Sequence, residues 1–239
     1  MNSTPDPIAG PAAACHPRTG AEAARYGVLR RLGPVLKHDM VVNLQAISMM
    51  AEVLNARLDR GTPSPADFRA DIGKLNRLAR EAVASSLKVA AWIEPGEDQG
   101  VGLREGVDEC IGLLASNFNF RGIAVSQAVA DGDFQVWRVA VRNVLVAALV
   151  ALTDASEGAC QVLVTAKVVD GSAEISVSIS PRSDGVDSHS FEPGYRHLEW
   201  ADVQALALAE AVELVRNGDQ VTMRMPRAVA TAPLQIAPV

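Results

Sequence analysis

The chain has 239 residues, a length that suits one large domain or two modest ones. Lys and Arg number 22 against 28 Asp and Glu, and the net charge of −6 disfavours a general nucleic-acid-binding protein, which needs a basic face. Three cysteines without metal-ligand spacing favour a reduced compartment over a disulfide framework. The sequence contains no run of eighteen apolar residues and no secretion signal, so we predict a cytoplasmic protein with no membrane partner.

Two long helices are predicted in the first hundred residues. Residues 1–20 are rich in Pro, Ala, Ser and Thr, and we expect them to form a disordered tail. A first helix is expected over 21–60, with an interruption or restart at Gly33-Pro34, and a second over 65–93. Because a short loop joins them, the two helices should form an antiparallel hairpin, which we take as a domain of residues 21–94.

The apolar residues of the first helix follow one stripe. Its members are Met40, Leu44, Ile47, Ala51, Leu54 and Leu58. Spacings of three and four residues are typical of a helix that packs in a bundle. One hairpin cannot cover both flanks of such a seam, so we predict a homodimer in which residues 34–94 form a four-helix bundle. The competing interpretation is that the stripe packs on the chain's own C-terminal half.

The pattern changes after Asp98 to that of an α+β domain, which we place at 99–226. Strands are expected at 101–103, 122–129, 159–168, 173–179 and 220–225, and helices at 104–118, 134–155 and 201–216. Helices on one face of a mostly antiparallel sheet would make a two-layer α/β sandwich. Residues 227–239 are expected to form a second tail.

His38 is predicted to project from the bundle into water. It lies about 160° around an ideal helix from Met40, a member of the apolar stripe. Asp39 follows directly, and a carboxylate beside an imidazole can hold the ring's tautomer while the ring acts as a nucleophile. An ordinary solvated surface histidine is the alternative interpretation.

The segment His38-Asp39-Met40-Val41-Val42-Asn43-Leu44-Gln45-Ala46-Ile47, followed by this α+β order, resembles the transmitter module of bacterial sensor histidine kinases. The resemblance implies that the hairpin serves dimerisation and phosphotransfer, with His38 as phosphoacceptor and Asp39 as its carboxylate partner. The second part is similar to the ATP-binding domain shared with gyrases and Hsp90 chaperones. Asn43 resembles an amide that one kinase subgroup uses to orient a hydrolytic water, and a polar residue on the helix flank is an equal alternative.

The nucleotide-binding residues that the resemblance implies are missing from this chain. The metal-binding asparagine aligns with Ala147 or Ala151, and alanine has no oxygen to offer a cation. The expected Asp-x-Gly-x-Gly turn is represented by Asp184-Gly185 alone. Residues 187–202, where a lid and a glycine-rich phosphate loop should be, contain only Gly194. We therefore expect a degenerate kinase-type domain that does not use ATP.

We interpret the chain as a phosphorelay histidine phosphotransferase of a two-component system. His38 would accept a phosphoryl group from an aspartate of one response-regulator receiver domain and pass it to another. No cofactor or metal of its own is expected, because the receiver would supply the magnesium. The alternative is a non-catalytic scaffold that binds a receiver domain or a true sensor kinase. An active ATP-dependent sensor histidine kinase ranks below both.

Overall fold

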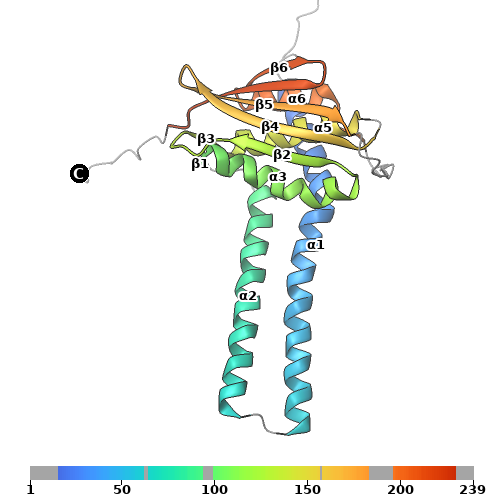
Figure 1. Ribbon diagram of the computed structural model, residues 1–239, viewed down its shortest axis with the longest axis vertical. Coiled ribbons are helices and arrows are strands. Elements are labelled where there is room, and N and C mark those ends of the chain that lie inside the picture. Colours follow the sequence, from blue (N-terminus) through green and yellow to red (C-terminus); the bar gives the residue numbers. More distant parts are fainter. Residues whose placement is uncertain (1–15, 62–63, 94–98, 157, 183–195, 230–239) are drawn as a thin grey trace, which may run out of the picture. The chain divides into compact units, whose positions relative to one another are not determined.

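The computed structural model describes residues 16–61, 64–93, 99–156, 158–182 and 196–229. They form two compact units, one of residues Leu29–Glu97 and one of the residues up to Val28 together with those from Asp98 onward. The class is α+β, as predicted: a long helical hairpin and a domain of helices against a sheet (Figure 1).

The hairpin consists of α1 (His16–Arg60) and α2 (Pro65–Ile93). Helix α1 begins before the expected Ala21, so part of the predicted N-terminal tail is helical. It also continues through Gly33-Pro34, where we expected an interruption. A proline inside a helix removes one backbone hydrogen bond, and long helical segments on both sides can keep the helix continuous.

The N-terminus of α2 is fixed by a side-chain cap. The Ser64 hydroxyl accepts a hydrogen bond from the backbone N–H of Asp67 at 3.2 Å, and it donates one to the Asp67 carboxylate at 2.7 Å. Leu54 of α1 and Ala82 of α2 are buried. The buried Asp71 of α2 forms ion pairs with Arg57 of α1 and with Lys74 one turn along α2. Apolar and ionic contacts together therefore hold the hairpin closed.

The α+β unit contains a five-stranded sheet in the order β2-β4-β5-β7-β6. Its strands are β2 (Ala124–Val129), β4 (Cys160–Val169), β5 (Ser172–Pro181), β6 (Glu213–Asn217) and β7 (Gln220–Pro226). Strand β2 pairs with β4 in parallel and all other pairs are antiparallel, in agreement with the predicted mostly antiparallel sheet. Asp170 and Gly171, both at positive φ, form the tight turn between β4 and β5.

Helices cover one face of this sheet and form the second layer (Figure 1). They are α3 (Leu103–Phe120), α6 (Trp200–Ala209) and a helical stretch made of α4 (Arg138–Ala140), the π-helical turn η2 (Val141–Leu145) and α5 (Val146–Asp154). Alternate residues of the central strands point to these helices and are fully buried, such as Val164, Val177 and Met223. The domain core therefore lies between the sheet and the helical stretch of α4, η2 and α5.

The predicted helix over 134–155 is wrong at its start. Residues Gln135–Trp137 form a short strand, β3, that pairs with β1 (Gly100–Gly102) in a separate two-stranded sheet. Val136 lies opposite Val101, and both side chains are buried. A pairing partner distant in sequence decides the structure here, because three residues carry no periodicity that separates strand from helix.

The predicted helix over 201–216 is wrong at its end. Helix α6 stops at Ala209, and Ala211 has a φ of 53°, a left-handed conformation that a helix cannot continue through. The chain then forms β6, which pairs with β7 across a tight turn that includes Gly218. Asn217-Gly218 thus lies at a hairpin turn rather than at the end of a helix.

Some predicted features lie outside the described residues: Asp184-Gly185, Gly194, most of both tails and most of the region 187–202. Within the described ranges, no helix combines the length and the apolar character that crossing a membrane requires.

Candidate functional site

His38 lies on the outer surface of α1 beside Asp39. Their side chains are 74% and 57% exposed, so solvent and a partner protein both have access. The Nδ1 atom of His38 is 3.5 Å from Oδ1 of Asp39, at the long limit of a hydrogen bond. With the proton on Nδ1, that nitrogen donates to the carboxylate and Nε2 carries the lone pair. The arrangement presents Nε2 as the nucleophilic atom.

Asn43 does not join this pair. Its side-chain nitrogen donates to the backbone carbonyl of Asp39 at 2.9 Å, one turn back along the same helix. On an ideal helix Asn43 lies about 140° from His38, so the amide faces another side. The structure thus brings together two of the three predicted site residues, and it places Asn43 as a polar residue bonded within its own turn.

Three exposed apolar residues lie on the same side of α1 as His38, with the exposed Gln45 and Glu52 between them. Val42, Met49 and Val53 follow His38 at helical spacing and lie within about 60° of it around an ideal helix. Their exposed fractions are 45%, 65% and 40%, which is high for large apolar side chains. We call these three residues the His38-side stripe. This stripe was not predicted, although its residues lie 4, 11 and 15 positions after His38 in the sequence.

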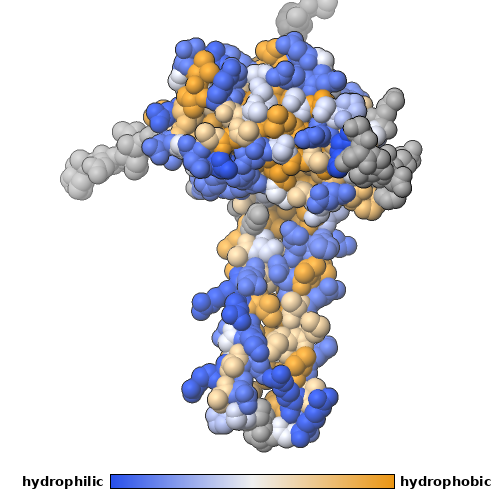
Figure 2. Space-filling model, in the orientation of Figure 1, coloured by the Kyte–Doolittle hydropathy of each residue, from blue (hydrophilic) through white to orange (hydrophobic). Residues whose placement is uncertain are grey.

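A second apolar surface lies elsewhere on the hairpin. Leu44 and Leu58 of α1 are 56% and 44% exposed, and Val83 and Leu87 of α2 are 59% and 66% exposed. Leu44 is about 120° around α1 from His38, so this surface is separate from the His38-side stripe. Because α2 runs antiparallel to α1, the helical rotation places Leu44 and Leu58 of α1 on the same side of the hairpin as the two α2 residues. Apolar surface is visible along the hairpin in Figure 2.

The resemblance implies a magnesium-nucleotide site on the helical stretch that contains α5. This stretch lacks the oxygen ligands that such a site needs. Every residue from Val146 to Leu152 is apolar and buried, including Ala147 and Ala151. The Asn143 side-chain nitrogen, one turn earlier, donates to Glu210 at 2.8 Å. A hard cation needs several oxygen ligands in the right geometry, and neither alanine position supplies one. These residues do not fit a magnesium-nucleotide site of the kinase type.

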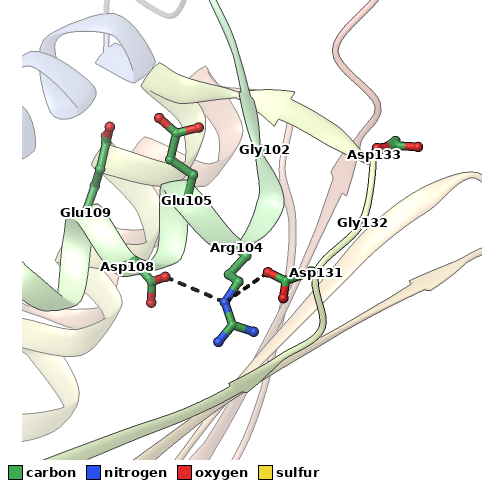
Figure 3. A pocket seen from close by; sticks show the side chains of 8 residues that line it. All are labelled: Gly102, Arg104, Glu105, Asp108, Glu109, Asp131, Gly132 and Asp133. Carbon is green, nitrogen blue, oxygen red and sulfur yellow. Dashed lines mark ion pairs between the residues drawn. The ribbon is translucent and has the colours of Figure 1, made fainter.

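A hollow in the α+β unit lies at the start of α3 (Figure 3). Its lining residues are Gly102, Arg104, Glu105, Asp108, Glu109, Asp131, Gly132 and Asp133. Figure 3 shows the Arg104 guanidinium between Asp108 and Asp131, with Nε at 3.8 and 3.2 Å from their carboxylates. Four of the five carboxylates are in ion pairs: Asp108 and Asp131 with Arg104, and Glu105 and Glu109 with Arg138. Sequence analysis did not find this hollow, because its two halves are separated along the chain.

Solved structures with a similar arrangement include two bacterial histidine kinases and a phosphotransferase. A histidine kinase from Burkholderia phymatum is 16% identical with a TM-score of 0.42, over 86% of this chain and 98% of that one. AdeS, a histidine kinase of Acinetobacter baumannii, is 11% identical with a TM-score of 0.40, over 81% and 98%. A bacterial phosphotransferase is 14% identical with a TM-score of 0.38, over 83% and 94%. Such low TM-scores carry no conclusion about activity. No protein-family model and no curated protein matches the chain.

Proposed function

We propose that the chain is a histidine phosphotransferase of a two-component phosphorelay, in which His38 carries the phosphoryl group and no nucleotide is used. The observation that carries the proposal is the exposed His38–Asp39 pair on a helix whose neighbouring surface is apolar and open. The buried alanines at positions 147 and 151 support transfer without ATP, because a phosphoryl group must then come from another donor.

The chemistry requires only groups that the chain and a receiver domain supply. Nε2 of His38 attacks the phosphorus of an aspartyl phosphate, the P–N bond forms, and the P–O bond to the aspartate breaks. The Nδ1 proton stays on the ring, and Asp39 stabilises the positive charge that develops on the imidazole. In the second half, a carboxylate oxygen of another receiver attacks the same phosphorus and the P–N bond breaks. The receiver domain would supply the magnesium that offsets the phosphate charge.

The His38-side stripe supports a protein as the phosphoryl donor. Small phosphodonors need no apolar surface, whereas a receiver domain must hold its aspartate against Nε2 during transfer. Val42 lies one turn after His38 and Met49 and Val53 extend the surface farther along α1. An apolar helix face beside the reacting atom gives binding energy that positions the reactants. We assign receiver docking to this stripe.

The second apolar surface supports a homodimer. Leu44, Leu58, Val83 and Leu87 form a row of large apolar side chains that one hairpin leaves open to solvent. A second hairpin brought against this side would make a four-helix bundle and would leave His38 of each protomer outside the interface. Dimerisation and receiver docking thus use different sides of α1.

A non-catalytic scaffold is the competing function, and it uses the same docking stripe without the imidazole. Incubating the protein with phosphorylated receiver domains and following the phosphate separates the two. The phosphotransferase gains acid-labile, base-stable phosphate at His38 and passes it to an unphosphorylated receiver. A protein that binds a receiver tightly yet gains no phosphate from any receiver is a scaffold.

A further inference from the structure

The first turns of α1 pack on the α+β unit rather than on the hairpin. Ala21, Ala24 and Val28 recur at helical spacing and are between 0% and 4% exposed. All three belong to the compact unit that contains the sheet. This segment, residues 16–28, is joined to the rest of the unit only through the long hairpin, so its position there depends on contacts and not on a short covalent connection.

Two glycines allow the close approach of this segment. A Cβ atom added at Gly27 would lie 3.1 Å from Cδ2 of Leu198, and one at Gly20 would lie 3.8 Å from Cβ of Ala205 in α6. The first distance is shorter than an ordinary van der Waals contact. The helix therefore lies directly against Leu198 and α6, and a side chain at Gly27 would require Leu198 to shift.

Arg25 fastens the segment to Glu210, a carboxylate that Asn143 also holds. Arg25 donates from Nη2 to Oε1 of Glu210 at 2.8 Å, and Asn143 donates from Nδ2 to the same oxygen at 2.8 Å. The Glu210 side chain is 9% exposed, which makes its charge dependent on these donors. Burial alone would lower the pKa of Arg25, but the hydrogen bond and charge of Glu210 outweigh burial and raise it. Asn143 lies in the π-helical turn η2, an irregularity that proteins often place at functional positions.

The apolar part of this contact is small. Alanine side chains bury little area, so Ala21 and Ala24 contribute far less than the leucine and valine side chains of the domain core. A segment whose buried side chains are mostly small opens more easily than the core around it.

We propose that Arg25, Glu210 and Asn143 form a latch that holds residues 16–28 on the α+β unit and that opens locally, as one step, without unfolding the domain. Opening exposes Leu198 and the adjoining face of α6 and frees the first turns of α1. A partner that binds the open form more tightly than the closed form shifts the equilibrium toward the open form, by an amount set by the difference in affinity. The inference is independent of phosphotransfer, since none of the three residues touches His38 in the described contacts.

Amide hydrogen exchange on the full-length protein tests the latch. In the unmodified protein, we expect the amides of residues 18–28 to exchange together, more slowly than an isolated helix and faster than those of β5. Arg25→Gln and Glu210→Gln each remove a charge-assisted hydrogen bond and should speed exchange in this segment by about tenfold or more, with β5 unchanged. Glu213→Gln, at an exposed glutamate of β6, is the matched control and should change neither.

The double variant distinguishes a latch from two unrelated surface changes. If Arg25 and Glu210 act through each other, combining Arg25→Gln with Glu210→Gln should speed exchange little more than either change alone. Arg25 is on the helix surface, so Arg25→Gln remains informative if Glu210→Gln fails to fold. The proposal is overturned if residues 18–28 exchange only with global unfolding, if they are unprotected in the unmodified protein, or if the two effects simply add.

Discussion

His38 and His197 each lie beside an aspartate, and the two pairs differ in the exposure and the other partners of that aspartate. In both pairs the ring Nδ1 is 3.5 Å from a carboxylate oxygen. Asp154, beside His197, is 3% exposed and already bound by Arg121 at 3.0 Å. A carboxylate shared with a guanidinium is a weaker partner for an imidazolium than one that faces only the ring and water. The difference makes His197 a suitable control for His38.

Replacing His38 should abolish phosphoryl uptake without harming the fold. His38→Gln removes an exposed side chain, so the free energy of unfolding should change by less than about 0.5 kcal/mol. Asp39→Asn should slow transfer while keeping the side-chain shape, because a neutral amide cannot stabilise the imidazolium charge. His197→Gln should leave uptake intact. Labelled phosphate from a phosphorylated receiver is the readout, and retention of uptake in His38→Gln would remove this residue from the mechanism.

The ion pairs of Asp71 should make the stability of the hairpin fall at acid pH. Desolvation raises the pKa of this carboxyl, but the Lys74 hydrogen bond, at 3.3 Å, and the Arg57 ion pair outweigh it, so the net pKa is lower than the usual 3.8. A carboxyl whose pKa is lower in the folded state stabilises the fold above its unfolded pKa and loses that contribution as the pH falls through the folded value. Urea unfolding should therefore show a stability loss below pH 3.8.

Asp71→Asn is the matching variant for this acid limit. It should be less stable than the unmodified protein at neutral pH and should lose less stability on acidification, so the two curves converge at low pH. Parallel curves would show that the ion pairs of Asp71 contribute nothing to the pH dependence. Asp59→Asn, at an exposed carboxyl of the same hairpin, serves as the control.

At the scale of elements, α1 carries two apolar surfaces, one proposed for dimerisation and one for receiver docking. Leu44 belongs to the surface shared with α2, and Met49 belongs to the His38-side stripe. The two residues have similar exposure, 56% and 65%, and the same helical context, so they form a matched pair for mutation. A charge placed on either surface should disturb only the contact that this surface makes.

Leu44→Glu should dissociate the dimer, because the bundle would bury an unpaired carboxylate. Met49→Glu should leave the dimer intact and weaken receiver binding. Sedimentation measures the first effect, and titration with a receiver domain measures the second. A monodisperse monomer of the unmodified protein at micromolar concentration would contradict the dimer. Loss of the dimer in Met49→Glu instead of Leu44→Glu would exchange the two assignments.

The elements that sequence predicted well are those with strong local signals. The hairpin and the β4–β5 pair follow from long periodic segments and from Asp170-Gly171, a dipeptide suited to positive φ. Strands β3 and β6 were missed because each depends on a partner strand that local periodicity does not reveal. At the site, the position of His38 followed from helical rotation alone. The Arg25–Glu210 contact could not be predicted from the sequence, because its two residues are 185 positions apart and no local pattern links them.

At the scale of the whole molecule, we predict no useful binding of Mg-ATP. Ala147 and Ala151 are buried among apolar side chains, so restoring one asparagine should not restore binding. Calorimetry should detect no micromolar affinity. A ligand present at a hundred times its dissociation constant would stabilise the protein by about 2.7 kcal/mol, so the absence of a thermal shift at millimolar Mg-ATP is a second check. Micromolar affinity in calorimetry would refute the prediction and favour the kinase alternative.

The contact between Arg25 and Glu210 also determines when folding can finish. Residues 16–28 leave the ribosome well before the side chains that receive them in α6 and at Glu210, because Arg25 and Glu210 are 185 residues apart. During that interval the first turns of α1 must wait as an isolated helix, which is marginally stable in water. The hairpin, whose contacts are closer in sequence, can close before the rest of the chain exists. We therefore expect ribosome-bound nascent chains that end before Leu198 to show a closed hairpin and exchanging amides in residues 18–28.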